Sequence, residues 1–151
     1  MATETIKLKY QDNICTISLN RPQAFNSMDE NMAGDFQKAL EEIKEDLKIR
    51  ALIVTGTGKA FCAGADLKML SNWITANPPR EEKEVFDFYQ CFLGITELRI
   101  PTIAALNGPA IGAGACLALA CDLRIAAQEA KLGFTFIQLG INPSQPHQQK
   151  Q

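Results

Sequence analysis

The sequence predicts an α/β fold, because stretches with the two-residue repeat of strands alternate with stretches that have the helical repeat. Apolar side chains alternate in residues 6–10 and again in residues 14–19, and the turn residues Asp12 and Asn13 separate the two runs, which predicts a β-hairpin. Residues 51–56 form a short, almost fully apolar run, which is typical of a strand that is buried on both faces. The segment between these features has the repeat of an amphipathic helix.

This first helix is expected to start near Met28. Ser27 and Glu30 have the spacing of a capping box, in which a hydroxyl and a carboxylate satisfy exposed amides at the helix start. Lys44, Lys48 and Arg50 suit the C-terminal end, where the helix dipole favours positive charge. One face is apolar and carries Met28, Met32, Phe36, Ala39, Leu40, Ile43 and Leu47.

The rest of the chain continues the alternation. A loop of small residues leads to a short helix expected from about Leu67, and the residues Asn77-Pro78-Pro79-Arg80 interrupt the chain after it. Three glutamates, Glu81, Glu82 and Glu84, start another helix. Its inward face is expected to carry Val85, Phe88, Tyr89, Phe92 and Ile95. Residues 102–106 predict a buried strand, residues 112–121 a helix of small residues, and residues 122–126 a further strand.

Composition excludes several classes of protein. The chain has 151 residues, which suits one domain, with 15 basic and 17 acidic residues and a net charge of −2. The weak acidity argues against a nucleic-acid partner, which needs a basic surface stripe. Residues 100–121 carry no charge, but prolines and glycines interrupt them, so a strand, a turn and a helix are favoured over a membrane span.

Cysteine use and the N-terminus indicate a cytoplasmic protein. The number of cysteines is odd and their spacing shows no disulfide framework, so reduced, buried thiols are expected. The first residues have neither an apolar signal segment nor an Arg-rich amphipathic stretch. The cysteines are Cys15, Cys62, Cys91, Cys116 and Cys121.

Several familiar catalytic motifs are missing. The stretch Gly56-Thr57-Gly58-Lys59-Ala60 lacks the first glycine and the hydroxyl residue of a phosphate-binding loop. The single histidine, His147, lies in the polar C-terminal stretch, which argues against a Ser/His or Cys/His dyad and against a His-based metal site.

Backbone amides at two helix starts remain as candidate chemical groups. Gly64-Ala65-Asp66 and Gly112-Ala113-Gly114 each precede or open a helix, whose first N–H groups are free and carry partial positive charge. If the two ends converge, they can bind a carbonyl oxygen and stabilise the oxyanion that it becomes. The alternative is that these small residues only allow tight packing of helix against sheet.

Four motifs occur together in a specific order. They are Asn20-Arg21-Pro22 with Asn26, then residues 59–68 (KAFCAGADLK), then residues 107–114 (NGPAIGAG), then Cys121-Asp122. In this combination the chain resembles the enoyl-CoA hydratase/isomerase (crotonase) family from about Ile6 to Pro143. The resemblance implies a spiral of ββα units, incomplete at the C-terminus, and a homo-oligomer, since family members form trimers.

The resemblance also implies a site. The N–H groups of Ala65 and Ala113 would form the oxyanion hole for an acyl-CoA thioester, with coenzyme A as part of the substrate and no cofactor or metal. The coenzyme A side would be lined by Ala63, Asp66, Leu67 and Lys68, with Asp66 near the adenine. For Lys68 alone, a solvated surface lysine is the alternative interpretation.

The sequence departs from the family's hydratases at both catalytic glutamates. The matching positions are Cys116 on the second glycine-rich helix and Phe136 after the next strand, and Gln23 replaces a basic residue that often follows Arg-Pro. A buried structural thiol is the favoured interpretation of Cys116, because an apolar helix raises a thiol pKa. Family chains also continue well beyond this one.

These features lead to a domain division and three functional interpretations. Residues 1–143 are expected to form a partial crotonase-like core, and the polar residues 144–151 a disordered tail, either a flexible terminus or the end of a chain cut short. The first interpretation is an acyl-CoA enzyme of the hydratase/isomerase type. The others are an inactive acyl-CoA-binding pseudo-enzyme and a truncated, non-functional product.

Overall fold

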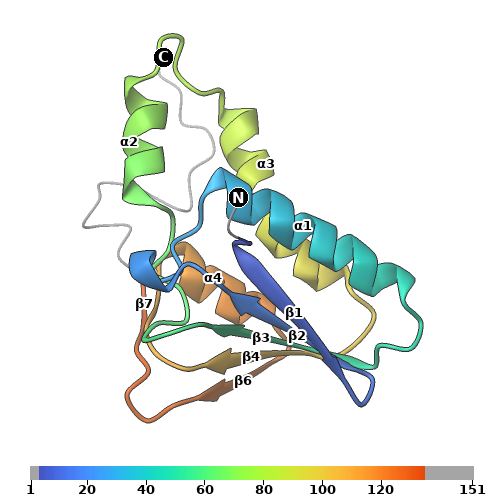
Figure 1. Ribbon diagram of the computed structural model, residues 1–151. Helices are drawn as coiled ribbons and strands as arrows, with labels where there is room; N and C mark the ends of the chain where they lie inside the picture. Colours follow the sequence, from blue (N-terminus) through green and yellow to red (C-terminus); the bar gives the residue numbers. More distant parts are fainter. Residues whose placement is uncertain (1–3, 135–151) are drawn as a thin grey trace, which may run out of the picture.

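A five-stranded sheet organises the molecule. The computed structural model describes residues 4–134, which contain the sheet, four α-helices and two short 3₁₀ turns (Figure 1). The strand order is β1-β2-β3-β4-β6; β1 and β2 are antiparallel, and every other neighbouring pair is parallel. The strands are β1 (Ile6–Gln11), β2 (Ile14–Leu19), β3 (Ala51–Gly56), β4 (Thr102–Leu106) and β6 (Leu123–Ala126). The predicted α/β class, hairpin and strands are confirmed, but burial of residues 51–56 on both faces is not: Leu52 and Val54 are buried on one face, whereas Ile53 and Thr55 on the other are half-buried.

A second, smaller sheet runs beside the first. It pairs β5 (Ala110–Ile111) with β7 (Leu132–Gly133) in parallel, and Cys62 extends it through a single bridge to Ala110. The chain thus alternates between sheets: β3 is followed by Cys62, β4 by β5 and β6 by β7. This repeated step agrees with the expected spiral of ββα units.

Helices α1 (Glu30–Glu45) and α4 (Ala113–Ala120) pack on one face of the large sheet, and α3 (Glu82–Leu93) packs against both of these helices. The other helical elements are α2 (Leu67–Thr75) and the 3₁₀ turns η1 (Pro22–Ala24) and η2 (Gly94–Glu97). The strand side chains on this face are fully buried, as at Ile17, Val54 and Ala104. They pack with helix residues that the sequence placed inward, including Phe36, Phe88 and Phe92. Val85 and Tyr89 lie at the border of this core and are half-buried.

Two details of α1 differ from the prediction. The N-cap residue is Asp29, whose Oδ1 accepts a hydrogen bond of 2.8 Å from the Met32 amide, so the expected Ser27 capping box is wrong. Ser27 is instead buried beside the Arg21 side chain, where its carbonyl accepts a hydrogen bond. The helix also ends at Glu45, which leaves Leu47 outside it and 92% exposed rather than in the apolar face.

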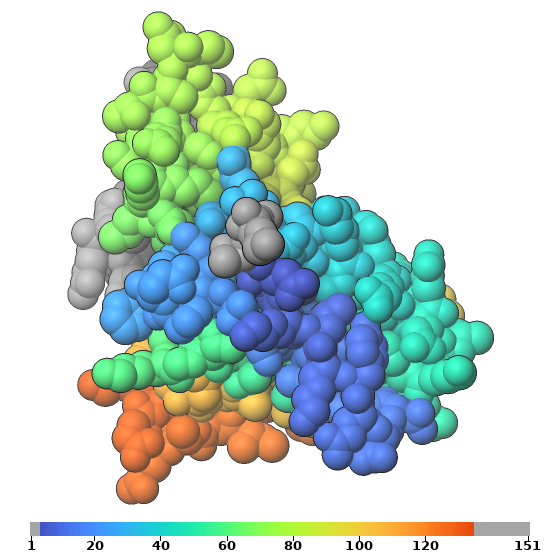
Figure 2. All heavy atoms as spheres, viewed as in Figure 1, coloured from blue at the N-terminus to red at the C-terminus, as the bar shows by residue number. Residues whose placement is uncertain are grey.

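The opposite face of the large sheet has little cover. Strand β6 lies at the sheet edge, and Leu123 and Ile125 on it are 58% and 66% exposed. Figure 2 shows the orange atoms of this C-terminal part at the lower end of the molecule. The uncharged stretch 100–121 folds as β4, β5 and α4, and within residues 4–134 no helix is long and apolar enough to cross a membrane.

Candidate functional site

The two glycine-rich segments singled out in the sequence lie against each other. The Ile111 amide donates to the Cys62 carbonyl at 2.9 Å, which joins the segments as neighbouring strands. Gly64 has φ +96°, and a Cβ built on it would lie 2.8 Å from the Ile111 carbonyl oxygen and 3.5 Å from the Ala113 nitrogen. A side chain would therefore clash, so glycine is required here for both its conformation and its close approach.

The peptide that joins Gly64 to Ala65 has a fixed orientation. The Met28 amide donates to the Gly64 carbonyl at 2.8 Å, and the Asp66 amide donates to the Met28 carbonyl at 2.8 Å. In a trans peptide the carbonyl and the N–H point in opposite directions. The N–H of Ala65 therefore points away from Met28, and no residue of the described chain accepts a hydrogen bond from it.

The peptide before Ala113 is fixed in a similar way. Gly112, with φ 54° and ψ −120°, is the N-cap of α4, and its carbonyl accepts a bond of 3.1 Å from the Cys116 amide. Ala113 is the first residue of α4, so its N–H points out of the helix N-terminus and has no intrahelical partner. Within residues 4–134 this N–H also donates to no other group.

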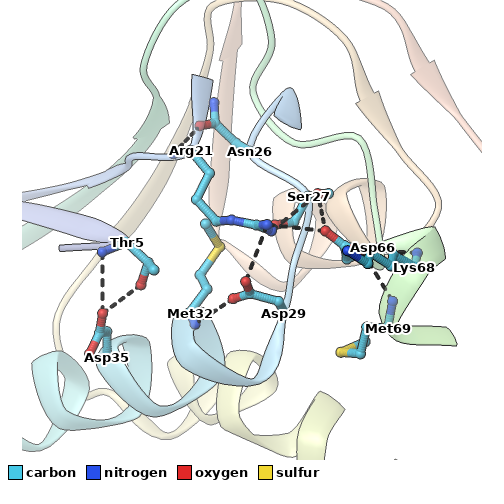
Figure 3. Close-up of polar contacts among 10 residues, drawn as sticks. All are labelled: Thr5, Arg21, Asn26, Ser27, Asp29, Met32, Asp35, Asp66, Lys68 and Met69. Carbon is cyan, nitrogen blue, oxygen red and sulfur yellow. Dashed lines mark hydrogen bonds and ion pairs between the residues drawn. The ribbon is translucent and has the colours of Figure 1, made fainter. Parts of the chain in front are cut away.

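Arg21 connects the starts of two helices (Figure 3). Its guanidinium lies 3.2 Å from an Asp29 oxygen and 3.1 Å from an Asp66 oxygen, and it also donates to the carbonyl of Ser27. Asp29 is the N-cap of α1 and Asp66 is the N-cap of α2. We call Arg21, Ser27, Asp29 and Asp66 the Arg21 clamp. In the sequence, Arg21 stood out only as part of the Asn20-Arg21-Pro22 motif.

The Asp66 carboxylate is held in its ionised form. Partial burial opposes ionisation, but hydrogen bonds from the Met69 amide, from Arg21 and from Ser27, together with the Arg21 charge, lower the pKa of Asp66 below its ordinary value. The same carboxylate caps α2 by accepting from the amides of Lys68 at 3.0 Å and Met69 at 3.2 Å. Its position near a coenzyme A adenine remains an expectation from the resemblance.

Two asparagines of the recognised motifs fix the loop that precedes the site. Asn26 is fully buried, accepts from the Arg21 amide, and donates to the carbonyls of Thr57 and Ala60 at 2.9 Å each. Asn107 donates to the carbonyls of Gly58 and Ala60, at 3.0 and 3.2 Å. Both side chains are therefore used within the protein, where they hold residues 57–60 in place.

The other residues expected to face coenzyme A lie on the surface beside Asp66. Ala63, Leu67 and Lys68 are all exposed, and Leu67 is 66% exposed although its side chain is apolar. Together they form an accessible rim at the start of α2, next to the Ala65 amide.

Cys116 lies one turn after Ala113 on α4 and is half-buried. Burial raises the pKa of its thiol above the ordinary value, which does not favour a thiolate nucleophile. Tyr89 of α3 lies near enough to interact with it: burial raises the pKa of Tyr89, and the charge of a Cys116 thiolate would raise it further. From the helical repeat of the sequence, Tyr89 was expected only to lie on the apolar face of its helix. Phe136, at the second glutamate position, lies outside the described residues.

Within the described chain, no group of three or more His, Cys, Asp or Glu side chains is arranged to hold a metal ion.

Comparisons with known proteins give the same family as the sequence motifs. Residues 9–149 match the enoyl-CoA hydratase/isomerase family. The crotonyl-CoA hydratase of Syntrophomonas wolfei is 37% identical over 144 residues, which cover 95% of this chain and 54% of that protein. The crystal structure of enoyl-CoA hydratase from Bacillus anthracis is 39% identical with a TM-score of 0.80, covering 92% of this chain and 54% of that one.

A further solved structure, an enoyl-CoA hydratase/isomerase from Mycobacterium paratuberculosis, is 31% identical with a TM-score of 0.81, covering 91% of this chain and 55% of that one. The chain spans about half the length of the curated relatives that it matches, 54% in two of them. The family match extends over nearly all of the sequence, and the structural agreement covers about nine-tenths of it. The chain therefore belongs to the enoyl-CoA hydratase/isomerase family and has the crotonase fold.

Proposed function

We propose that this chain binds an acyl-CoA thioester and polarises its carbonyl between the backbone N–H groups of Ala65 and Ala113. The observation that supports the proposal is the contact between the two glycine-rich segments, where the Ala113 nitrogen lies 3.5 Å from the position of a Cβ on Gly64. Neither N–H donates to another group of the described chain. Two such donors are what a developing oxyanion requires.

The chemical consequence is a more electrophilic thioester. Hydrogen bonds to the carbonyl oxygen draw electron density from the conjugated double bond of an enoyl-CoA, which favours water addition at the β-carbon. In a saturated acyl-CoA they acidify the proton next to the carbonyl. Removal of one such donor in enzymes lowers the rate by about 10²–10³. The two amides would therefore supply a large part of the rate acceleration that backbone groups can give.

The surface beside Ala65 suits the coenzyme A part of the substrate. Lys68 provides a cation for a phosphate group, and Leu67 provides an exposed apolar side chain at the start of α2. The amides of Lys68 and Met69 are already used by Asp66. Phosphate recognition would therefore come from the Lys68 side chain rather than from the helix N-terminus.

Proton transfer is the part of hydration that this chain supplies least well. Cys116 and Phe136 stand where hydratases of the family hold two glutamates, and each missing acid–base group costs about 10²–10⁴ in rate. We therefore propose an acyl-CoA site with slow hydration of enoyl-CoA. An acyl-CoA-binding pseudo-enzyme is the limiting case of this proposal, in which binding persists and turnover is absent.

A pair of ligands tests the proposed contact with the carbonyl. One is butyryl-CoA, a thioester, and the other is the S-butyl thioether of coenzyme A, which has the same chain length but no carbonyl oxygen. Calorimetric titration should give tighter binding of the thioester. Equal affinity for the two ligands would refute the oxyanion hole, and failure of both to bind would refute the acyl-CoA site.

We also propose that the chain forms a homo-oligomer through the open face of the large sheet. The strands β2, β3, β4 and β6 are parallel, and parallel sheets are almost always covered on both faces. Here Leu123 and Ile125 are largely exposed on that face. Sedimentation velocity should show a species larger than the monomer, and Ile125→Lys should shift the distribution toward the monomer.

A further inference from the structure

We propose that Arg21 is a positioning residue for the Ala65 amide, so that the Arg21 clamp sets the direction of one of the two oxyanion donors. This inference rests on the proposed function. It concerns a side chain that approaches the site only through other residues, since its polar partners are Ser27, Asp29 and Asp66.

The backbone geometry shows how the effect would be transmitted. Met28 is the residue that fixes the Gly64–Ala65 peptide, because its N–H donates to Gly64 and its carbonyl accepts from Asp66. Arg21 holds both neighbours of Met28: its Nη1 donates to the Ser27 carbonyl, and its Nη2 lies 3.2 Å from the Asp29 carboxylate. Met28 therefore has little freedom to rotate away from the glycine.

Arg21 also holds the other side of the Ala65 peptide. Its Nη2 lies 3.1 Å from Asp66 Oδ2, and Ser27 Oγ donates to the same oxygen at 3.2 Å. The residues before and after Ala65 are thus both tied to the segment 27–29, and a single guanidinium closes the arrangement (Figure 3). A planar guanidinium with several N–H donors can make these contacts at once, whereas the single ammonium of lysine fits them less well.

The clamp is shielded enough for its charges to matter. The side chains of Arg21, Asp29 and Asp66 are only 18–20% exposed. Charge-assisted hydrogen bonds are stronger than neutral ones, and they become stronger still where water is partly excluded. Without the guanidinium, the Asp29 and Asp66 carboxylates would repel each other across the segment that holds Met28.

The helix caps and the clamp use different carboxylate oxygens, which allows a clean test. Asp66 Oδ1 accepts the amides that start α2, and Asp29 Oδ1 accepts the amide that starts α1, while Oδ2 of each residue faces Arg21. Asparagine caps helices about as well as aspartate. Asp66→Asn should therefore keep its cap and lose its ion pair with Arg21 together with the hydrogen bond from Ser27 Oγ.

The experiment measures the affinity for butyryl-CoA relative to the S-butyl thioether in four proteins: the wild type, Arg21→Gln, Asp66→Asn and Asp35→Asn. The ratio of the two affinities cancels any contribution of Asp66 to coenzyme A binding, because both ligands contain the whole coenzyme A group. We expect Arg21→Gln and Asp66→Asn to lose most of the wild-type preference for the thioester. Asp35→Asn, the matched control, should retain it, since the Asp35 carboxylate on α1 accepts hydrogen bonds from Thr5 and is not part of the clamp.

The outcomes are distinguishable. If the wild type shows no preference for the thioester, the proposed function fails. If the wild type shows the preference and Asp66→Asn retains it, the positioning role is refuted while the proposed function survives. Loss of the preference in Asp35→Asn as well would indicate a general structural effect and would also overturn the positioning role. Circular dichroism melting checks that each variant is folded, and if Arg21→Gln is not, the two asparagine variants decide the matter.

Discussion

Replacement of Gly64 by alanine is the most informative small perturbation of the proposed site. The new Cβ would lie 2.8 Å from the Ile111 carbonyl oxygen, closer than van der Waals contact allows, and 3.5 Å from the Ala113 nitrogen. The backbone at Gly64 has φ +96°, a conformation that alanine rarely adopts. The two segments must therefore move apart, or the Gly64 peptide must rotate.

Both effects have an expected size. The strained conformation costs about 1–3 kcal/mol and the overpacked contact a similar amount, so the free energy of unfolding should fall by about 2–6 kcal/mol. For a chain of this length that corresponds to a decrease in Tm of about 10 °C. The preference for the thioester should fall as well, because rotation of the peptide turns the Ala65 N–H away from the carbonyl oxygen that we propose it shares with Ala113.

The matched control is Gly34→Ala. Gly34 lies inside α1, and a Cβ built there would meet nothing within 4 Å. Alanine in a helix interior is favoured over glycine by about 0.5–1 kcal/mol, so this variant should melt at a higher temperature than the wild type and bind butyryl-CoA equally well. Thermal melting and calorimetric titration of both variants form the assay. A Gly64→Ala protein with wild-type Tm and wild-type thioester preference would refute the geometry described above.

Three further predictions concern turnover, pH and the loop before the site. Crotonyl-CoA hydration, monitored through the loss of enoyl absorbance, should be far slower than in ordinary hydratases. If the missing acid–base groups are the cause, the double variant Cys116→Glu, Phe136→Glu should hydrate crotonyl-CoA faster. Fast turnover by the wild type would contradict this prediction. Because the folded-state pKa of Asp66 is lowered, its ionisation stabilises the fold above the ordinary carboxyl pKa, and this contribution is lost as the pH falls through the lower folded value. The stability difference between wild type and Asp66→Asn should accordingly be largest near neutral pH and shrink in acid urea titrations, and a constant difference would argue against the clamp. Asn26→Ala leaves the Thr57 carbonyl and the Arg21 amide without their partner in a buried site, so urea unfolding should show a loss of about 3 kcal/mol, against about 1 kcal/mol for the exposed Asn107→Ala.

Local sequence patterns predicted most of the fold. The hairpin was readable because Asp12 and Asn13 both adopt the positive φ that a tight turn needs, 51° and 63°, and asparagine and aspartate tolerate this conformation. The strand β3 was readable from its apolar run, but its burial was overestimated, because helices pack only on the face that carries Leu52 and Val54 and leave Ile53 half-buried. The helix start at Asp29 was missed, since Ser27 and Glu30 also fit a capping pattern, and only the tertiary contact of Ser27 with Arg21 selects the aspartate.

The site was predictable in part. The glycine-rich segments could be recognised from the sequence, since each lies at the start of a helix. Their contact, however, depends on the parallel β-bridge between Cys62 and Ala110 in the small sheet. No sequence pattern of strand or helix repeats shows that pairing. Arg21 and Tyr89 were missed for the same reason: Arg21 is 45 residues from Asp66, and Tyr89 approaches Cys116 only because α3 packs beside α4.

The central claim is that two backbone N–H groups bind one thioester oxygen, and the variant that isolates one of them is Ala113→Pro. Proline is tolerated at the first position of a helix. The residue before a proline is usually extended, and Gly112, at φ 54° and ψ −120°, has the mirror image of that conformation. For glycine, which has no Cβ, the two mirror images are equivalent, so Gly112 can precede a proline. The substitution therefore removes the donor while the helix can remain.

The most direct measurement is the infrared carbonyl stretch of crotonyl-CoA labelled with ¹³C at the thioester carbon, recorded by difference spectroscopy in the bound state. A polarised carbonyl has a weaker C=O bond, so the wild type should shift the band to lower wavenumber than free crotonyl-CoA in water. In Ala113→Pro the band of the bound ligand should return toward the free value. A bound carbonyl whose frequency equals that of the free ligand in the wild type, or is the same in both proteins, would contradict the proposed oxyanion hole.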